Sequence, residues 1–270
     1  MKTILMISDQ SPEAAHAGRF ALELARAARA DLLLAYTVPA TPIRKTQLVP
    51  AGNLDEPDEL LANSSKNNFT EGCYQPKISN LDISDYLLDD LVALIYRQGI
   101  WLIIEGMPEH TTTSARPKLN RQSLLNRVRC PLLLMPEHVP VRLPERIAYL
   151  ADLRYCRREV LLFLNELAQA LAARLTVANL AAKGLADIVD SYAAELFRKD
   201  VLPYTSQVEV SLNNIRERNL HKAADVLIHG MQQDWLVLVN HRYHFEELIG
   251  RQLGDTLPPE LTVPLLIFPL

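Results

Sequence analysis

Glycine is scarce in this sequence, with only nine among its 270 residues. Loops that cradle phosphate need glycines close together, because a residue without a Cβ lets backbone N–H groups approach the phosphate oxygens. No Gly-x-x-x-x-Gly-Lys motif is present, and the glycines form no obvious alternative cradle. The composition therefore excludes a P-loop nucleotide site of the usual kind.

Cysteine is rarer still, and its three residues lie far apart: Cys73, Cys130 and Cys156. The odd number and the lack of Cys-x-x-Cys spacing indicate free thiols in a reducing compartment. Cys156 has arginines nearby at positions 154, 157 and 158, which would lower the pKa of an exposed thiol. A reactive Cys156 is therefore one hypothesis, and an inert buried cysteine is the commoner alternative.

The chain also has no excess of basic residues and no long apolar run. Its formal net charge is −4 at pH 7, which gives no electrostatic basis for binding nucleic acid or anionic lipid. No apolar stretch approaches the roughly 20 residues of a membrane span. Residues 1–9 read as a short strand that leads into the fold, not as a signal peptide. We expect a cytoplasmic protein with no nucleic-acid or membrane partner.

No arrangement of residues points to catalysis. The Gly-x-Ser-x-Gly nucleophile elbow is missing, and no Ser, His and Asp order stands out. His241 and His244, followed by two glutamates, could contribute to a metal site, but a polar loop that enters a helix at Phe245 is the favoured interpretation. The basic segment 116–129 reads as an amphipathic surface helix, either solvated or a docking surface for an acidic partner. We predict that the protein is not an enzyme.

An internal repeat is the strongest positive feature. ELARAARADLLLAYTV at 23–38 matches ELAQALAARLTVANLA at 166–181, at an offset of 143. Asp9 and Asp152, which each close an apolar strand, share that offset. WLIIEG at 101–106 matches WLVLVN at 235–240, and CPLLLMP at 130–136 matches VPLLIFP at 263–269. Four matches in one order predict two tandem domains of one kind, 1–139 and 140–270.

The pattern within each half is typical of an α/β fold. Short apolar runs without alternation predict strands that are buried on both faces of a parallel sheet, and helical patterns separate them. Ser11 and Pro12 predict the start of the first helix, and Gly99 the end of another. The expected strands are 3–7, 32–38, 101–104, 131–135, 147–150, 175–180, 207–212, 235–239 and 265–268. The expected helices are 12–30, 82–97, 158–173, 186–197 and 219–232. The first half has about nine extra residues, placed in the polar stretch 63–72.

These motifs together resemble the universal stress protein family, in its duplicated form. The resemblance rests on Asp9-Gln10-Ser11 after the first strand, on LLLAYTVP, on IIEG ending at Gly106, and on CPLLLMP. It implies two tandem open parallel five-stranded sheets with helices on both faces of each. It also implies a ligand site at the carboxyl ends of the strands. Cofactor-binding positions would then be Asp9, Val38, Gly106 and Asp152, with an aspartate recognising adenine.

The sequence departs from the ATP-binding pattern of that family. Its phosphate loop has the form Gly-x-x-Gly, nine residues, then Gly-Ser/Thr. Here Glu109 stands at the second glycine position, and residues 119–120 are Leu-Asn. In the second half Asn240 replaces the first glycine and Tyr243 the second. Glu105 and Glu109 would also place negative charge beside a triphosphate. Asp9 and Asp152 are equally suited to capping a helix.

Two functions follow from these observations. The first is a non-enzymatic stress-response protein with degenerate nucleotide loops, which carries no cofactor and acts through unidentified protein partners. The alternative is a switch that binds ATP or AMP, or a weak ATPase, which uses the strand-end residues. The resemblance also implies an internal pseudo-dimer joined through the last strands of the two halves, since these would otherwise leave an apolar edge exposed. A further homodimer through helices stays open.

Overall fold

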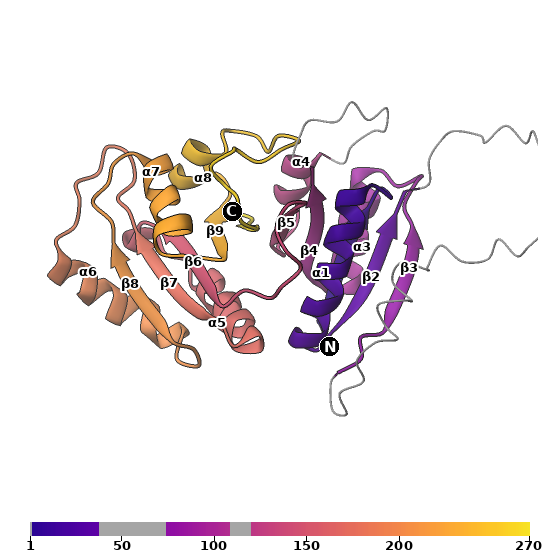
Figure 1. The fold of residues 1–270 in the computed structure, drawn as a ribbon, viewed down its shortest axis with the longest axis horizontal. Coiled ribbons are helices and arrows are strands. Elements are labelled where there is room, and N and C mark those ends of the chain that lie inside the picture. Colours follow the sequence, from indigo (N-terminus) through magenta and orange to yellow (C-terminus); the bar gives the residue numbers. More distant parts are fainter. Residues whose placement is uncertain (1, 38–73, 109–119) are drawn as a thin grey trace, which may run out of the picture.

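The computed structural model describes residues 2–37, 74–108 and 120–270 (Figure 1). Val38, Glu109 and the polar stretch 63–72 lie outside the described residues. The strands are β1 Lys2–Ser8, β2 Ala30–Tyr36, β3 Ile78–Asp82, β4 Ile100–Met107, β5 Leu132–Pro136, β6 Arg146–Ala151, β7 Arg174–Asn179, β8 Val210–Asn214, β9 Trp235–Val239 and β10 Leu265–Phe268.

All of these strands belong to one ten-stranded sheet of order β3-β2-β1-β4-β5-β10-β9-β6-β7-β8. The two halves have the same internal order, and every neighbouring pair within a half is parallel. The α/β fold with parallel strands is thereby confirmed. The sequence predicted two sheets, whereas the structure has a single sheet because β5 and β10 pair antiparallel, with Leu266 opposite Leu133.

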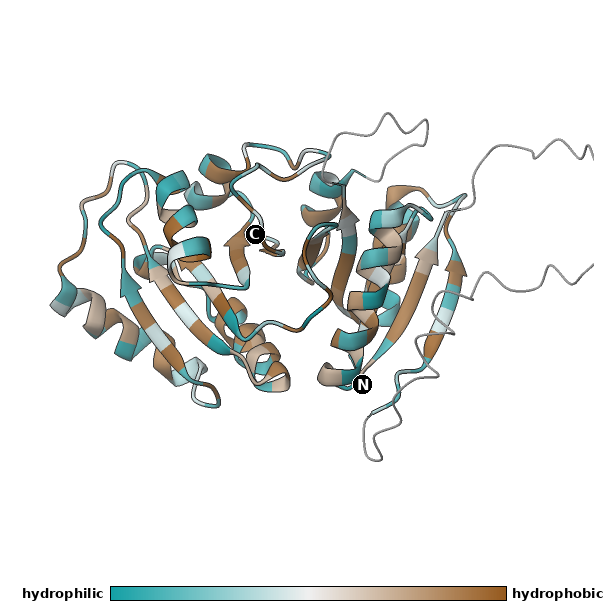
Figure 2. Cartoon of the chain, in the orientation of Figure 1, coloured by the Kyte–Doolittle hydropathy of each residue, from teal (hydrophilic) through white to brown (hydrophobic). Residues whose placement is uncertain are grey.

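Helices cover both faces of the sheet, as the sequence predicted. They are α1 Pro12–Ala28, α3 Leu88–Gln98, α4 Arg121–Leu125, α5 Arg158–Leu171, α6 Asp190–Leu196, α7 Leu220–Asp225 and α8 Tyr243–Leu248. The core cluster on one face is formed with α1, α5 and α6, and the cluster on the other face with α3, α4, α7 and α8. The inner strands are largely hydrophobic, while the helices carry hydrophilic residues on their outer sides (Figure 2). No helix in the described ranges is long and apolar enough to cross a membrane.

Local signals account for the ends of several helices. The Ser11 hydroxyl accepts a hydrogen bond from the Ala14 amide at 3.2 Å and caps α1, with Pro12 at its first position. Gly99 ends α3 in the left-handed conformation, at φ 59°. The helix predicted from residue 82 instead begins at Leu88, because residues 78–82 form β3. That strand escaped prediction because it lies at the edge of the sheet and is mostly exposed.

The two halves exchange aromatic contacts across the junction. Phe20 of α1 packs against Trp235 of β9, with ring centroids 5.8 Å apart. Phe163 of α5 stacks on Trp101 of β4, with centroids 4.8 Å apart. Phe20 and Phe163 are the same position of the repeat, and so are Trp101 and Trp235. Each helix therefore places its phenylalanine on the tryptophan of the other half, the reciprocity expected of two copies around a two-fold axis.

Polar contacts strengthen the same junction. Lys2 forms an ion pair with Glu166 of α5 at 2.9 Å, and its ammonium group lies 4.5 Å from the centre of the Trp101 ring. Each core cluster contains residues from both halves. The sheet and the two cores are thus continuous from one half to the other.

Because the cores are shared, the halves should unfold together. Phe20 is fully buried, so Phe20→Ala should lower the free energy of unfolding by about 3–5 kcal/mol. Urea denaturation followed by tryptophan fluorescence and by circular dichroism should give one transition, at lower urea in the variant. Two separate transitions, with only one of them moved by the substitution, would show that the halves unfold independently.

Candidate functional site

The first candidate site lies where β1 and β4 end side by side. β1 pairs with β4, with Ile7 opposite Glu105, so Asp9 and Gly106 lie at the same edge of the sheet. The Asp9 carboxylate is partly exposed and accepts a hydrogen bond from the Ser11 amide at 3.1 Å, just before α1. The structure therefore brings together two of the four predicted cofactor-binding residues, beside the positive end of a helix dipole.

Gly106 has a packing role in this arrangement. A Cβ at this position would lie 2.3 Å from the Glu13 carbonyl oxygen and 2.9 Å from the Ala14 amide nitrogen. Both atoms belong to the backbone of the first turn of α1, which cannot move without shifting the whole helix. Glycine is needed here so that α1 can lie close against β4, and this requirement is independent of any ligand.

An ion pair occupies the end of β4. Arg121, at the start of α4, binds the Glu105 carboxylate at 2.8 Å, and the two side chains are only 8% and 14% exposed. Arg121 also donates to the Gly254 carbonyl of the second half at 3.2 Å. Burial by itself would lower the pKa of Arg121, but the charge and hydrogen bond of Glu105 together with the charges of Asp255 and Asp9 outweigh it. The pKa is therefore raised and the guanidinium stays charged.

The prediction of a solvated basic helix over 116–129 is therefore wrong at Arg121. The described part of that segment contains only the short helix α4, and Arg121 points into the protein. It directly follows Leu119-Asn120, which stand where the ATP-binding pattern requires Gly-Ser/Thr. Asn120 itself caps α4, since its side chain accepts a hydrogen bond from the Ser123 amide at 2.8 Å.

The second candidate site, at the end of β6, is closed by an arginine. Asp152 is buried, and both of its oxygens bind Arg154, at 2.8 Å from Nε and 2.6 Å from Nη2. The Ala182 amide donates to the same carboxylate at 3.0 Å. Burial alone would raise the pKa of Asp152, but these hydrogen bonds outweigh it and lower the pKa. The carboxylate thus has its hydrogen-bonding capacity taken up within its own half.

Asn240, in the position of the first glycine of the second half, joins the two halves. It is fully buried, accepts from Gln122 Nε2 at 2.9 Å, and donates to Asn126 Oδ1 at 3.0 Å. His241 Nε2 lies 2.8 Å from the same Asn126 oxygen. We refer to Gln122, Asn126, Asn240 and His241 as the inter-half clasp. It stands where a phosphate-binding backbone would have to be open.

The other candidate residues take structural roles. Burial raises the pKa of the Cys156 thiol to about 12, with Asp152 and Asp200 adding to the shift, which disfavours the thiolate that a reactive Cys156 requires. Burial likewise raises the pKa of Cys130 to about 12, and Cys73 lies outside the described residues. His244 is buried with a lowered pKa, again because of burial, and its neutral ring donates to the Leu180 carbonyl at 2.8 Å.

No metal site is present in the part of the chain that the structure describes. His241 and His244 turn to different partners, and no group of three His, Cys, Asp or Glu side chains in the described ranges could hold an ion. The favoured interpretation of a polar loop that enters a helix agrees with α8, which begins at Tyr243.

The predicted cofactor-binding residues lie at two separate sites: Asp9 and Gly106 are together in the first half, and Asp152 is in the second half. β5 and β10 run antiparallel, so the carboxyl ends of the strands in the two halves lie at opposite edges of the sheet. Sequence reasoning missed the clasp and the Glu105–Arg121 pair. The amides at 122, 126 and 240 were a usable signal, since polar residues that interrupt an apolar pattern often form buried networks.

Comparison with known proteins identifies the fold. No family model matches the sequence, and no curated protein matches it. Among solved structures, a universal stress protein from Archaeoglobus fulgidus DSM 4304 superimposes with a TM-score of 0.60 at 11% identity, covering 98% of this chain and 97% of that chain. The chain has the universal stress protein fold.

Two further structures agree over nearly the full length. A protein assigned to the universal stress proteins, from Pseudomonas aeruginosa UCBPP-PA14, gives a TM-score of 0.53 at 15% identity over 99% of this chain and 93% of that chain. A functionally unknown protein from Pseudomonas aeruginosa PAO1 gives 0.52 at 15% identity, over 99% and 92%. The universal stress protein fold therefore extends across both halves of the chain, and the sequence resemblance agrees with this likeness in structure.

The packing role of Gly106 predicts opposite effects on stability for alanine substitutions at Gly106 and at Gly18. Gly106→Ala should lower the free energy of unfolding by about 1–3 kcal/mol, because the added methyl overlaps the α1 backbone. Gly18→Ala is the matched control, since Gly18 lies inside α1 with no atom within 4 Å of an added Cβ; it should raise stability by about 0.5–1 kcal/mol. Urea denaturation measures both. Equal stability of Gly106→Ala and wild type would contradict the packing role.

Proposed function

We propose that this chain is a duplicated universal stress protein that has lost nucleotide binding and acts in the stress response without catalysis, through contacts with other proteins. The observation that carries the proposal is that the residues at the strand ends contact other parts of the chain. In both halves, residues that would have to face a nucleotide are bound to other parts of the chain. The proposal includes an internal pseudo-dimer, which the reciprocal aromatic contacts support.

The chemistry of the first half disfavours a triphosphate. A phosphate loop offers backbone N–H groups and a positive potential to the ligand. Here the end of β4 carries the buried Glu105 carboxylate, and Arg121 is bound to it at 2.8 Å. A triphosphate placed beside this strand end would have to compete with Glu105 for the guanidinium, and the separation of a buried ion pair is costly.

In the second half, the strand-end site is even less accessible to a nucleotide. An adenine amino group would need an acceptor oxygen from Asp152, but Arg154 and Ala182 already donate to both oxygens. Asn240 fills the place of the first glycine and is fully buried. The side chains that replaced the family pattern thus stabilise the fold instead of a ligand.

Exposed side chains beside this closed site support a role in protein contacts. Tyr155, Val189 and Tyr192 are 51%, 64% and 45% exposed. The pKa of Arg154 is raised first by its hydrogen bond with Asp152 and further by Tyr155 and Tyr192, so both tyrosines lie near its guanidinium. Tyrosine and arginine are the residue types that dominate binding energy at protein interfaces. This surface is where we propose that a partner contacts the second half.

A switch that binds ATP or AMP remains the second candidate function, because of the first half. Asp9 is partly exposed at the end of β1 and lies beside the N-terminus of the 17-residue helix α1. That arrangement offers an acceptor for adenine and a favourable dipole for phosphate. It lacks the second glycine and the Gly-Ser/Thr pair of the family pattern.

Thermal unfolding with and without ATP and Mg²⁺ distinguishes the two functions. A ligand present at about 100 times its Kd would stabilise the folded state by about 2.7 kcal/mol. We expect no change in Tm at millimolar ATP or AMP, for wild type and for Asp9→Asn alike. Asp9→Asn is the matched variant because an amide oxygen can still accept the hydrogen bond from the Ser11 amide. A nucleotide-dependent rise in Tm that is lost in Asp9→Asn would overturn the proposal in favour of the switch.

A further inference from the structure

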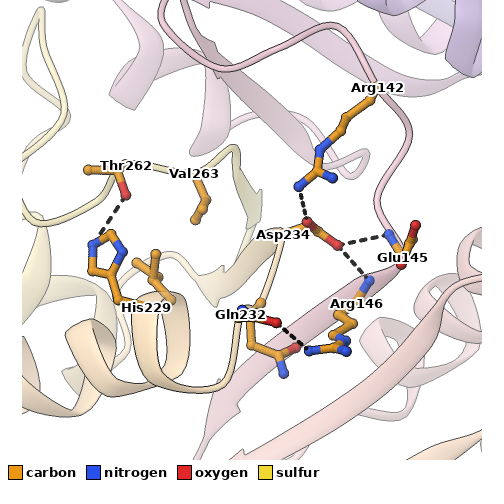
Figure 3. A pocket seen from close by; sticks show the side chains of 10 residues that line it. Arg142, Glu145, Arg146, His229, Gln232, Asp234, Thr262 and Val263 are labelled. Carbon is orange, nitrogen blue, oxygen red and sulfur yellow. Dashed lines mark hydrogen bonds and ion pairs between the residues drawn. The ribbon is translucent and has the colours of Figure 1, made fainter.

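A separate pocket lies away from both strand-end sites, at the amino ends of β6, β9 and β10 (Figure 3). It is open and has a volume of about 470 Å³, within the range of small-molecule sites. The segment that joins the two halves forms one wall, the turn that follows α7 forms another, and the turns before β9 and β10 complete it. Its polar lining residues include Arg142, Glu145, Arg146, His229, Gln233 and Thr262.

The backbone around this pocket departs from regular structure at two places. The chain after α7 winds as a π-helical turn, Val226–Gly230, which contributes His229 to the lining. Gln232 then adopts a left-handed conformation at φ 53°, unusual for a residue with a side chain. π-Helical turns and left-handed residues other than glycine both concentrate at functional sites. Here the two occur within a few residues of each other and border one pocket.

The Gln233 side chain adds a polar group that the protein does not satisfy. Gln233 is 5% exposed, and its Oε1 atom is buried without a hydrogen-bond partner in the described part of the chain. A buried acceptor left without a donor costs about 1–3 kcal/mol. Rotation of the amide by 180° presents either its oxygen or its nitrogen to the pocket. A ligand with an N–H group would supply the missing donor.

The charges of the pocket are matched only in part. Asp234 accepts hydrogen bonds from Arg142 at 2.7 Å and from the backbone amides of Glu145 and Arg146 at 2.9 and 3.0 Å, as Figure 3 shows. The Arg146 guanidinium contacts neutral acceptors, the Met231 carbonyl and Gln232 Oε1. In the described ranges neither Arg146 nor the Glu145 carboxylate has an ion-pair partner. The pocket is thus lined by one cation and one anion that have no ion-pair partner among the described residues.

We propose that this pocket binds a small zwitterion, a free amino acid or a related amino-carboxylate. Its carboxylate pairs with Arg146, and its ammonium group donates to Glu145 and to the Gln233 carboxamide. The apolar side chains of Ile228 and Val263, which also line the pocket, contact the remainder of the ligand. A simple anion would leave Glu145 unmatched and repelled, and a simple cation would do the same to Arg146. Only a molecule with both charges satisfies every group named above.

Thermal unfolding in the presence of each standard free amino acid tests this proposal, followed by isothermal titration with those that stabilise. At least one amino acid should raise the Tm by several degrees when well above its Kd. Glu145→Gln and Gln233→Leu should each weaken its Kd by about ten- to a hundredfold, as expected for the loss of a hydrogen bond to a charged group. Gln233→Leu removes a buried unsatisfied acceptor, so the ligand-free variant should unfold at the same temperature or higher.

The exposed residues Gln169 and Glu195, on α5 and α6, supply matched controls. Gln169→Leu and Glu195→Gln repeat the chemical changes away from the pocket and should leave the Kd unchanged. The proposal fails if no amino acid alters the Tm, or if Glu145→Gln and Gln233→Leu bind as wild type does. It also fails if acetate or inorganic phosphate binds as tightly as the amino acid and binding does not depend on Glu145, since the site would then recognise anions alone.

Discussion

The antiparallel pairing of β5 with β10 is the interaction on which the rest of the molecule depends. It turns two five-stranded parallel arrays into one sheet and hides the apolar last strand of each half, which would otherwise be an open edge. It also brings α1 against α5 across the junction, where Phe20 meets Trp235 and Phe163 meets Trp101. Each core cluster includes residues from both halves, so we expect stability to be a property of the pair.

The same pairing explains why the segments that follow β4 and β9 contact the other half of the chain. β4 and β9 are the neighbours of β5 and β10, so the segments that follow them lie beside the junction. In the first half Arg121 reaches the Gly254 carbonyl, and in the second half Asn240 reaches Gln122 and Asn126. Amides and an arginine at these positions brace the halves, whereas glycine could not. We propose that these contacts take the place of the open backbone that phosphate recognition requires.

Much of this arrangement could be predicted from the sequence, and the exceptions have physical causes. The repeat and the continuous apolar runs predicted the parallel α/β fold, since strands buried on both faces leave that pattern. The exposed edge strand β3 leaves no such pattern and was missed. The packing role of Gly106 could not be predicted, because a sequence cannot distinguish a glycine beside phosphate from one beside a helix backbone. Asn240 was seen as a departure from a motif and Arg121 as part of a basic segment. Their partners across the junction, Gln122 and Gly254, are more than 100 residues away in the chain.

The central claim is that the strand-end residues now hold the halves together. A double-mutant cycle on Asn126→Ala and Asn240→Ala, measured by urea denaturation, tests it most directly. The two side chains share a hydrogen bond of 3.0 Å across the junction. Their effects on the free energy of unfolding should therefore be non-additive, with a coupling of about 0.5–3 kcal/mol. Additive effects, within about 0.3–0.5 kcal/mol, would contradict the account.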